Sequence, residues 1–153
     1  MDDSSAALFE TVVIAVDGSD AGREAARIGL DLAEGLHAEA FFVHGSETLA
    51  RQVFESAADP EALPPVEFDP VLRDAEELAR GRCVESQFQV WPAAGVDDVA
   101  GVVTAVADAH RPALIVVGSR GRGAVTSTVL GSVSRAILAG TDLPVVIVHA
   151  PRG

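Results

Sequence analysis

Glycine and serine residues between positions 118 and 134 have the types and spacing of a phosphate-binding segment. Gly118, Gly121 and Gly131 allow backbone amides to approach a ligand closely. Ser132 stands where a helix is expected to begin, and the first turn of a helix offers unpaired N–H groups with a positive dipole. The hydroxyls of Ser132 and Ser134 add donors. Each residue alone also fits a strand end, a turn or a helix cap, so the prediction depends on their combination.

The charge of the chain is unevenly distributed in a way that supports this prediction. The chain carries 23 acidic and 11 basic residues, which gives a formal net charge of −12. Yet no Asp or Glu occurs from Ala109 to Thr141, the stretch that contains the glycines and several arginines. Because carboxylates would repel an anionic ligand, their absence here favours a phosphate site.

The absence of Lys excludes several nucleotide and cofactor chemistries. Every basic residue counted above is Arg, whereas a Walker A loop, a protein-kinase ATP site and a Schiff-base enzyme each need a Lys. Phosphate must then be held by backbone amides, hydroxyls and Arg, which favours binding over phosphoryl transfer. The net charge opposes binding to nucleic acid. An acidic, Lys-free composition is typical of proteins that function in concentrated salt, and GC-rich coding explains it equally well.

The elements that must position these residues follow from the apolar pattern. Short apolar runs predict strands at residues 11–16, 40–44, 113–117 and 145–149, and the alternating pattern of residues 84–91 predicts a further strand, five in all. Helical spacing follows the first strand, where Ser19 or Asp20 can act as the cap, and recurs from about residue 71, from about residue 96 and at 132–139. This alternation predicts a three-layer α/β sandwich around a parallel sheet, with ligands at the carboxyl ends of the strands.

Length and composition indicate a single domain. The 153 residues suit one core. We assign residues 11–150 to the domain, residues 1–10 to an acidic tail, and the proline-containing residues 46–70 to an irregular insertion. No window reaches the ~18 apolar residues of a membrane span and no signal peptide is evident, so we expect a cytoplasmic protein without a membrane partner. Cys83 is alone and the histidines lack ligand spacing, so no protein-held metal is expected.

The spacing Gly118-x2-Gly121-x9-Gly131-Ser132, flanked by LIVVGSRGRG and LGSVSRAILAGTDLPVVIV, resembles the ATP-binding signature of the universal stress protein family. The opening VVIAVDGSDAGREAARIGLDLA is similar to that family's first strand and helix. The resemblance implies a Rossmann-like fold of the adenine nucleotide alpha hydrolase type. It also implies one adenine nucleotide per subunit, ATP or else AMP or ADP, with Mg²⁺ bound through the nucleotide. A homodimer through the strand at 145–149 is implied as well, whereas a downstream protein partner stays unknown.

The resemblance also implies roles for individual residues. Asp17 would lie near the adenine end of the nucleotide, beside the backbone of Ala15 and Val16. Relatives often end the second strand with a His-Val pair, but this chain has His44-Gly45, which leaves open whether the base is held more loosely or other residues supply the apolar contact. The ribose and phosphates would be bracketed by Gly118, Ser119, Arg120, Gly121, Arg122, Gly131, Ser132, Val133 and Ser134.

Three functions fit these observations. A regulatory or stress-response domain that binds ATP without dedicated catalysis is favoured, because no acid or His lies between His110 and Asp142. A slow ATP hydrolase or nucleotidyl-transfer enzyme would need a general base or a metal carboxylate near the phosphates, and Asp17 is the candidate for it. The third function is a dimeric interaction module with a vestigial nucleotide site, which pairs through the apolar strand at 145–148.

Overall fold

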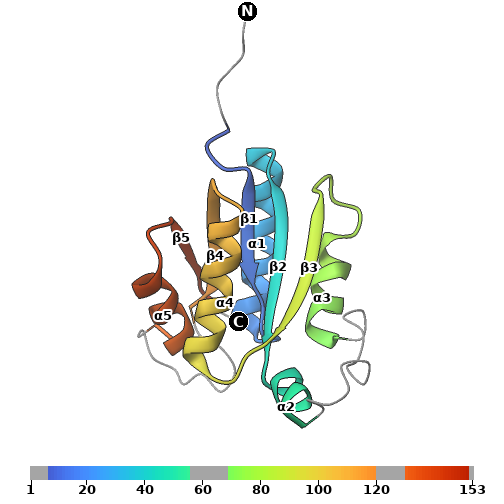
Figure 1. The fold of residues 1–153 in the computed structure, drawn as a ribbon. Coiled ribbons are helices and arrows are strands. Elements are labelled where there is room, and N and C mark those ends of the chain that lie inside the picture. Colours follow the sequence, from blue (N-terminus) through green and yellow to red (C-terminus); the bar gives the residue numbers. More distant parts are fainter. Residues whose placement is uncertain (1–6, 56–68, 120–129, 152–153) are drawn as a thin grey trace, which may run out of the picture.

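A parallel β-sheet forms the centre of the structure, a computed structural model that describes residues 7–55, 69–119 and 130–151. Its strands have the order β3-β2-β1-β4-β5, and every neighbouring pair is parallel. The strands are β1 (Thr11–Ala15), β2 (Glu39–Ser46), β3 (Ser86–Pro92), β4 (Ala113–Gly118) and β5 (Val145–Val148). All five carboxyl ends therefore lie at one edge of the sheet, the lower edge in Figure 1.

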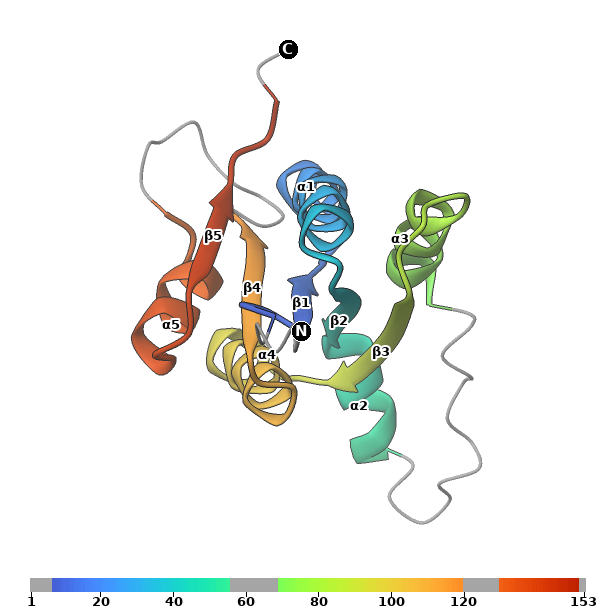
Figure 2. The ribbon, with the colours of Figure 1, turned by 90° about the horizontal axis from the view of Figure 1, so that it is seen from above.

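Helices cover both faces of this sheet. The helices of the described residues are α1 (Asp20–Leu36), α2 (Glu47–Glu55), α3 (Pro70–Ala79), α4 (Val96–Ala109) and α5 (Ser132–Gly140). Figure 2 shows α1 and α3 on one face and α4 and α5 on the other. Helix α2 lies on neither face but beyond the carboxyl end of β2 (Figure 1). The predicted three-layer α/β sandwich with a five-stranded parallel sheet is confirmed.

The central strands β1 and β4 read as continuous apolar runs because the sheet is buried on both faces there, whereas the edge strand β3 contains polar residues and has no buried residue. Side chains of alternating positions enter two separate cores, since successive strand residues point to opposite faces. Val12, Ile14 and Phe42 pack toward α1 and α3, whereas Val13 and Phe41 pack toward α4 and α5. Among the described residues, no helix combines the length and the hydropathy that a membrane crossing requires.

The segment after β2 differs from the irregular insertion expected at 46–70. Residues 47–55 form helix α2, whose start is capped by Ser46, because its Oγ accepts a hydrogen bond from Leu49 N–H at 3.1 Å. The prolines that suggested irregularity all follow this helix, and Pro70 is the first residue of α3, a position that Pro favours. The expectation was therefore wrong for 47–55, and residues 56–68 lie outside the described part of the chain.

Candidate functional site

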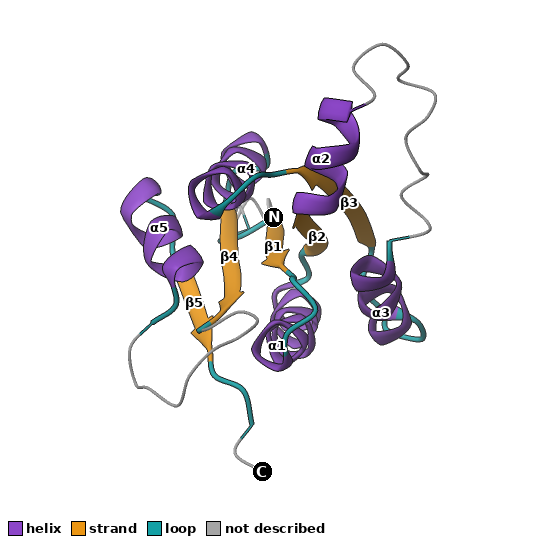
Figure 3. Ribbon diagram, turned by 90° about the horizontal axis from the view of Figure 1, so that it is seen from below, coloured by secondary structure: helices purple, strands orange, loops and turns teal. Residues whose placement is uncertain are grey.

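The sheet has a topological switch point between β1 and β4. From β1 the chain continues to β2 and β3 on one side, whereas β4 is followed by β5 on the other side. The two sets of connections diverge at this point, and a crevice forms outside the carboxyl ends of the central strands. Figure 3 views the molecule from below, toward this edge. The sequence-derived candidates that the structure describes lie at the carboxyl ends of β1, β2 and β4 and at the start of α5.

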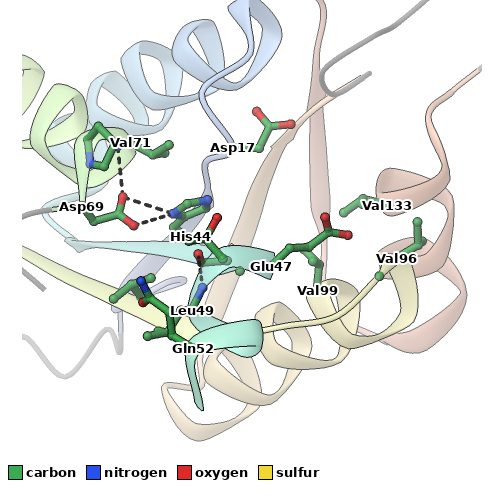
Figure 4. A pocket seen from close by; sticks show the side chains of 16 residues that line it. Asp17, His44, Glu47, Leu49, Gln52, Asp69, Val71, Val96, Val99 and Val133 are labelled. Carbon is green, nitrogen blue, oxygen red and sulfur yellow. Dashed lines mark hydrogen bonds and ion pairs between the residues drawn. The ribbon is translucent and has the colours of Figure 1, made fainter. Parts of the chain in front are cut away.

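A cavity of about 600 Å³ opens at this edge. Its polar side chains include Asp17, which follows β1, together with His44 from β2 and Asp69, which precedes α3. Helix α2 contributes Glu47 and Gln52. The apolar lining comes from several elements: Leu49, Val71, Val90, Val96, Val99 and Val133. Figure 4 labels five of these side chains around the same space, all but Val90. The cavity therefore combines apolar walls with hydrogen-bonding groups at defined positions.

Asp17 is fixed in position by the start of α1. Its Oδ1 accepts hydrogen bonds from Ser19 N–H at 2.9 Å and from Ser19 Oγ at 2.5 Å. The same Ser19 Oγ caps α1 by accepting a hydrogen bond from Gly22 N–H at 3.0 Å, which confirms Ser19 rather than Asp20 as the cap. A Cβ on Gly22 would lie 2.6 Å from Asp17 Oδ1, so only glycine leaves room for this carboxylate. The sequence analysis did not identify Gly22.

Ala15 and Val16 lie behind Asp17 rather than in the cavity. Both are buried, and neither lines the cavity wall. Val16 N–H donates to the carbonyl of Val43 at 3.0 Å, so this amide is already occupied by β2. These two residues therefore anchor the chain directly before Asp17 in the sheet.

Gly45 lies in β2, which extends to Ser46. Helix α4 packs beside Gly45, where a larger residue would have its side chain. A Cβ on Gly45 would lie 3.0 Å from Val99 Cγ2 and 3.2 Å from the Cβ of Ala93. Val99 lines the cavity at this point, together with Val96 from the first turn of α4. An apolar wall is therefore present beside Gly45, and α4 supplies it instead of β2.

Residues 119 and 131 bring together the two ends of the predicted phosphate segment. Gly131 N–H donates to the Ser119 carbonyl at 2.6 Å, and Ser119 N–H donates to the Val148 carbonyl at 2.7 Å. Ser134 is buried, and its hydroxyl donates to the carbonyls of Ser119 at 3.2 Å and Gly131 at 3.0 Å. Ser134 therefore helps to hold residues 119 and 131 next to each other.

The start of α5 faces the same edge of the sheet. Its N-cap is Gly131, and no described side chain caps the first turn. Ser132 is exposed and Val133 lines the cavity, so the first turn of α5 borders the space that Asp17 also borders. Arg120, Gly121 and Arg122 lie outside the described residues.

Gly118 has a packing role that its sequence context did not reveal. A Cβ at this position would lie 2.8 Å from the backbone carbon of Ala21 and 2.9 Å from Gly22 N. The carboxyl end of β4 and the first turn of α1 are therefore in direct backbone contact. This contact closes the crevice between β1 and β4 from the α1 side.

A His–Asp pair in the cavity was missed by the sequence analysis. His44 Nδ1 lies 3.0 Å from Asp69 Oδ2 and 3.1 Å from Asp69 Oδ1, and both side chains are more than four-fifths buried. Asp69 also caps α3, where its Oδ1 accepts from Val71 N–H and Leu72 N–H, both at 3.0 Å. The dipeptide Asp69-Pro70 is a helix-start signal, but nothing local links it to a His that is 25 residues away in the chain.

No group of three or more His, Cys, Asp or Glu side chains within residues 7–55, 69–119 and 130–151 is arranged to hold a metal ion. Three carboxylates line the cavity, from Asp17, Glu47 and Asp69, but Asp69 is taken up by His44 and α3.

The chain is a member of the Universal stress protein family, whose sequence model matches residues 8–149. A relative from Thermus aquaticus, named for its position beside a QAH/OAS sulfhydrylase gene, is 28% identical over 149 residues, which are 93% of this chain and all of that protein.

Solved structures of the same family share the fold. A universal stress protein in complex with cAMP superposes with a TM-score of 0.64 at 24% identity, over 94% of this chain and 98% of that one. A universal stress protein from Archaeoglobus fulgidus in complex with dAMP gives a TM-score of 0.61 at 20% identity, over 92% and 98%.

Proposed function

We propose that this protein binds an adenine nucleotide, ATP with Mg²⁺ in particular, and acts as a regulatory, stress-response domain without dedicated catalysis. The observation that carries the proposal is the cavity at the switch point, which runs from the polar end of β2 to the first turn of α5. Two family structures of the same fold hold adenine nucleotides, cAMP and dAMP.

The order of the strands gives the nucleotide a direction. Phosphates fit the first turn of α5, which no described side chain caps and whose N–H groups attract anions. Asp17 lies one strand away, at the end of β1, and His44 lies one strand further, on β2. Neighbouring strands are about 4.8 Å apart, so the distance from β4 to β2 is about 10 Å. This span matches a nucleotide with its phosphates at α5 and its base at β2.

The charge of the cavity supports the same direction. Asp17, Glu47 and Asp69 line it, and none of the described residues that line it is an Arg. This acceptor-rich space suits the uncharged adenosine end of the ligand, whose hydroxyls and amine are donors, and would repel phosphates. We place the phosphates, and the Mg²⁺ that they carry, at the start of α5, which belongs to the stretch without Asp or Glu from Ala109 to Thr141.

Binding without turnover follows from the groups near the phosphates. No Asp, Glu or His occurs from residue 111 to residue 141. Asp17 Oδ1 already accepts two hydrogen bonds from Ser19, which makes Asp17 a fixed acceptor rather than a free base. We further propose that the protein acts in the cytoplasm as a homodimer, and that nucleotide occupancy is the signal it transmits to a partner protein.

Calorimetric titration with ATP and Mg²⁺ at high salt tests the proposal. Wild-type protein should bind one nucleotide per subunit, and Gly131→Val should abolish binding by filling the space at the first turn of α5. Gly35→Val is the matched control, because a Cβ on Gly35 meets nothing within 4 Å. Lack of binding by the wild type, or full affinity in Gly131→Val, would contradict the proposal.

Turnover of radiolabelled ATP tests the non-catalytic part separately. The proposal expects no hydrolysis above the rate of an equal solution of Mg²⁺ and ATP without protein. Hydrolysis that disappears in Asp17→Ala, but not in Asp74→Ala on the outer part of α3, would identify an ATPase instead. Asp74 is suitable as the control because it is partly exposed and does not line the cavity.

A further inference from the structure

The His44–Asp69 pair fixes which nitrogen of His44 carries a proton. Asp69 is an acceptor in its ionised form, so a ring nitrogen that lies 3.0 Å from its Oδ2 must be the N–H donor. Asp69 is held in place because its Oδ1 accepts the N–H groups of Val71 and Leu72. A neutral His44 is therefore protonated on Nδ1, and its Nε2 carries a lone pair.

This Nε2 atom is open to the cavity. No described residue makes a hydrogen bond to it, and no buried side-chain nitrogen or oxygen in the described parts of the chain is left without a partner. Nε2 must therefore be accessible, and His44 lines the cavity. Figure 4 shows Nε2 on the ring edge away from Asp69. The result is a hydrogen-bond acceptor whose direction is fixed, with the apolar side chains of Val71 and Val90 in the same cavity wall.

The surroundings of His44 suit the edge of a flat base. Val90 is the neighbour of His44 on β3, and Val71 follows Asp69 at the start of α3; both line the cavity. On the other side of β2, Val99 fills the space beside Gly45. Apolar side chains beside an oriented acceptor match a flat heterocycle that carries an N–H donor at its edge.

We propose that His44 Nε2, oriented by Asp69, accepts a hydrogen bond from the exocyclic amine of the bound base and so selects adenine over a base that has a carbonyl oxygen at the same position. This inference rests on the proposed nucleotide-binding function and adds the residue that determines base specificity. His44 contacts the ligand, and Asp69 is a positioning residue that acts through it. A carbonyl oxygen facing Nε2 would leave two acceptors opposed and unpaired, which is costly in a buried site.

Asp69→Asn is the variant that separates specificity from structure. Asn is as good a helix cap as Asp, so its Oδ1 can keep the hydrogen bonds from Val71 and Leu72. Its NH₂ group then takes the place of Oδ2 and donates to His44 Nδ1. The proton of the ring must move to Nε2, and the acceptor in the cavity becomes a donor. Asp74→Asn removes the same charge from α3 outside the cavity and serves as the control.

The measurement is the affinity for ATP and for inosine triphosphate, which has an oxygen in place of the 6-amine. Wild type and Asp74→Asn should prefer ATP by roughly 10- to 100-fold, the effect of one opposed buried acceptor pair. Asp69→Asn should lose or invert this preference while it still binds a nucleotide. Nitrogen-15 spectra should show the His44 proton on Nδ1 in the wild type and on Nε2 in Asp69→Asn.

His44→Phe keeps the test decisive if Asp69→Asn does not fold. This variant removes the acceptor and should bind both nucleotides with similar affinity. Wild-type affinities within twofold of each other, or an unchanged preference in either His44→Phe or folded Asp69→Asn, would overturn the inference while the proposed nucleotide binding stands. Wild-type protein that binds neither nucleotide would overturn both.

Discussion

Individual glycines determine how closely the elements around the site pack. Gly118 and Gly22 allow the end of β4, the start of α1 and the Asp17 carboxylate to meet, because a Cβ on either would lie within 3 Å of another residue. Gly29 allows the same close approach in the middle of α1, where a Cβ would lie 2.5 Å from Ile14 Cδ1. The close packing of β4, α1 and Asp17 at the switch point therefore requires glycine at positions 22 and 118.

Substitution of Gly118 by Ala should destabilise the protein. The new methyl group would press on the backbone of Ala21 and Gly22, which cannot rotate away, and we expect a loss of about 1–3 kcal/mol in the free energy of unfolding. Gly101→Ala is the control, since a Cβ there meets nothing and Ala favours the helix by about 0.5–1 kcal/mol. Denaturant unfolding measures both, and equal stability of Gly118→Ala and wild type would contradict the packing role.

At the residue scale, roles that depend on neighbouring residues in the sequence could be predicted, whereas contacts between residues far apart in the sequence could not. Ser19 could be identified as a helix cap because it stands directly before the apolar periodicity of α1. The partnership of His44 with Asp69 could not be found, because it depends on how α3 is placed against β2. Gly45 was interpreted as a missing apolar contact, whereas the side chain of Val99 from α4 occupies that space.

Arg111 forms ion pairs with the two acidic residues that flank the stretch without Asp or Glu. It follows α4 and pairs with Asp108 in the last turn of that helix and with Asp142 in the loop before β5. Arg111 is therefore engaged in structural ion pairs, although it lies inside the stretch that the sequence analysis associated with phosphate. These hydrogen bonds from Arg111 lower the pKa of the Asp142 carboxyl below its ordinary value of 3.8.

The Arg111–Asp142 pair gives a testable dependence of stability on pH. A carboxyl group whose pKa is lowered in the folded state stabilises the fold above its unfolded pKa, and this contribution disappears as the pH falls through the folded pKa. The stability difference between wild type and Asp142→Asn should therefore be largest near neutral pH and should vanish in acid. Because both side chains are exposed, 1 M salt should reduce the difference. Equal differences at pH 3 and pH 7 would contradict this account.

At the element scale, the sequence predicted all five strands and four of the five described helices. Buried parallel strands are continuous apolar runs, and the helices that cover them have one apolar face, so both patterns are visible in the sequence. Helix α2 escaped prediction although Leu49 and Val53 have helical spacing, because it has only 9 residues, none of them buried, and stands directly before the proline-containing segment.

The whole molecule has an apolar sheet edge at β5 that fits the proposed homodimer. The carbonyls of Pro144 and Val148 accept hydrogen bonds from Ile115 N–H in β4 and from Ser119 N–H directly after it. The alternating residues Val145 and Ile147 therefore direct their backbone N–H groups away from β4, toward the outer edge of the sheet. Light scattering at micromolar concentration should find a dimer for the wild type. Val145→Pro removes one outward N–H and should shift the protein toward monomer while it remains folded. A wild-type monomer would contradict the proposed dimer.

The crystal structure of the protein with ATP and Mg²⁺ tests the central claim most directly, because it locates the ligand on the sheet. The account predicts the base in the cavity between His44 and Val99, the ribose near Asp17, and the phosphates at Gly131 and Ser132. A nucleotide bound in the reverse direction or away from the carboxyl edge of the strands, or an empty site at saturating ATP, would contradict it.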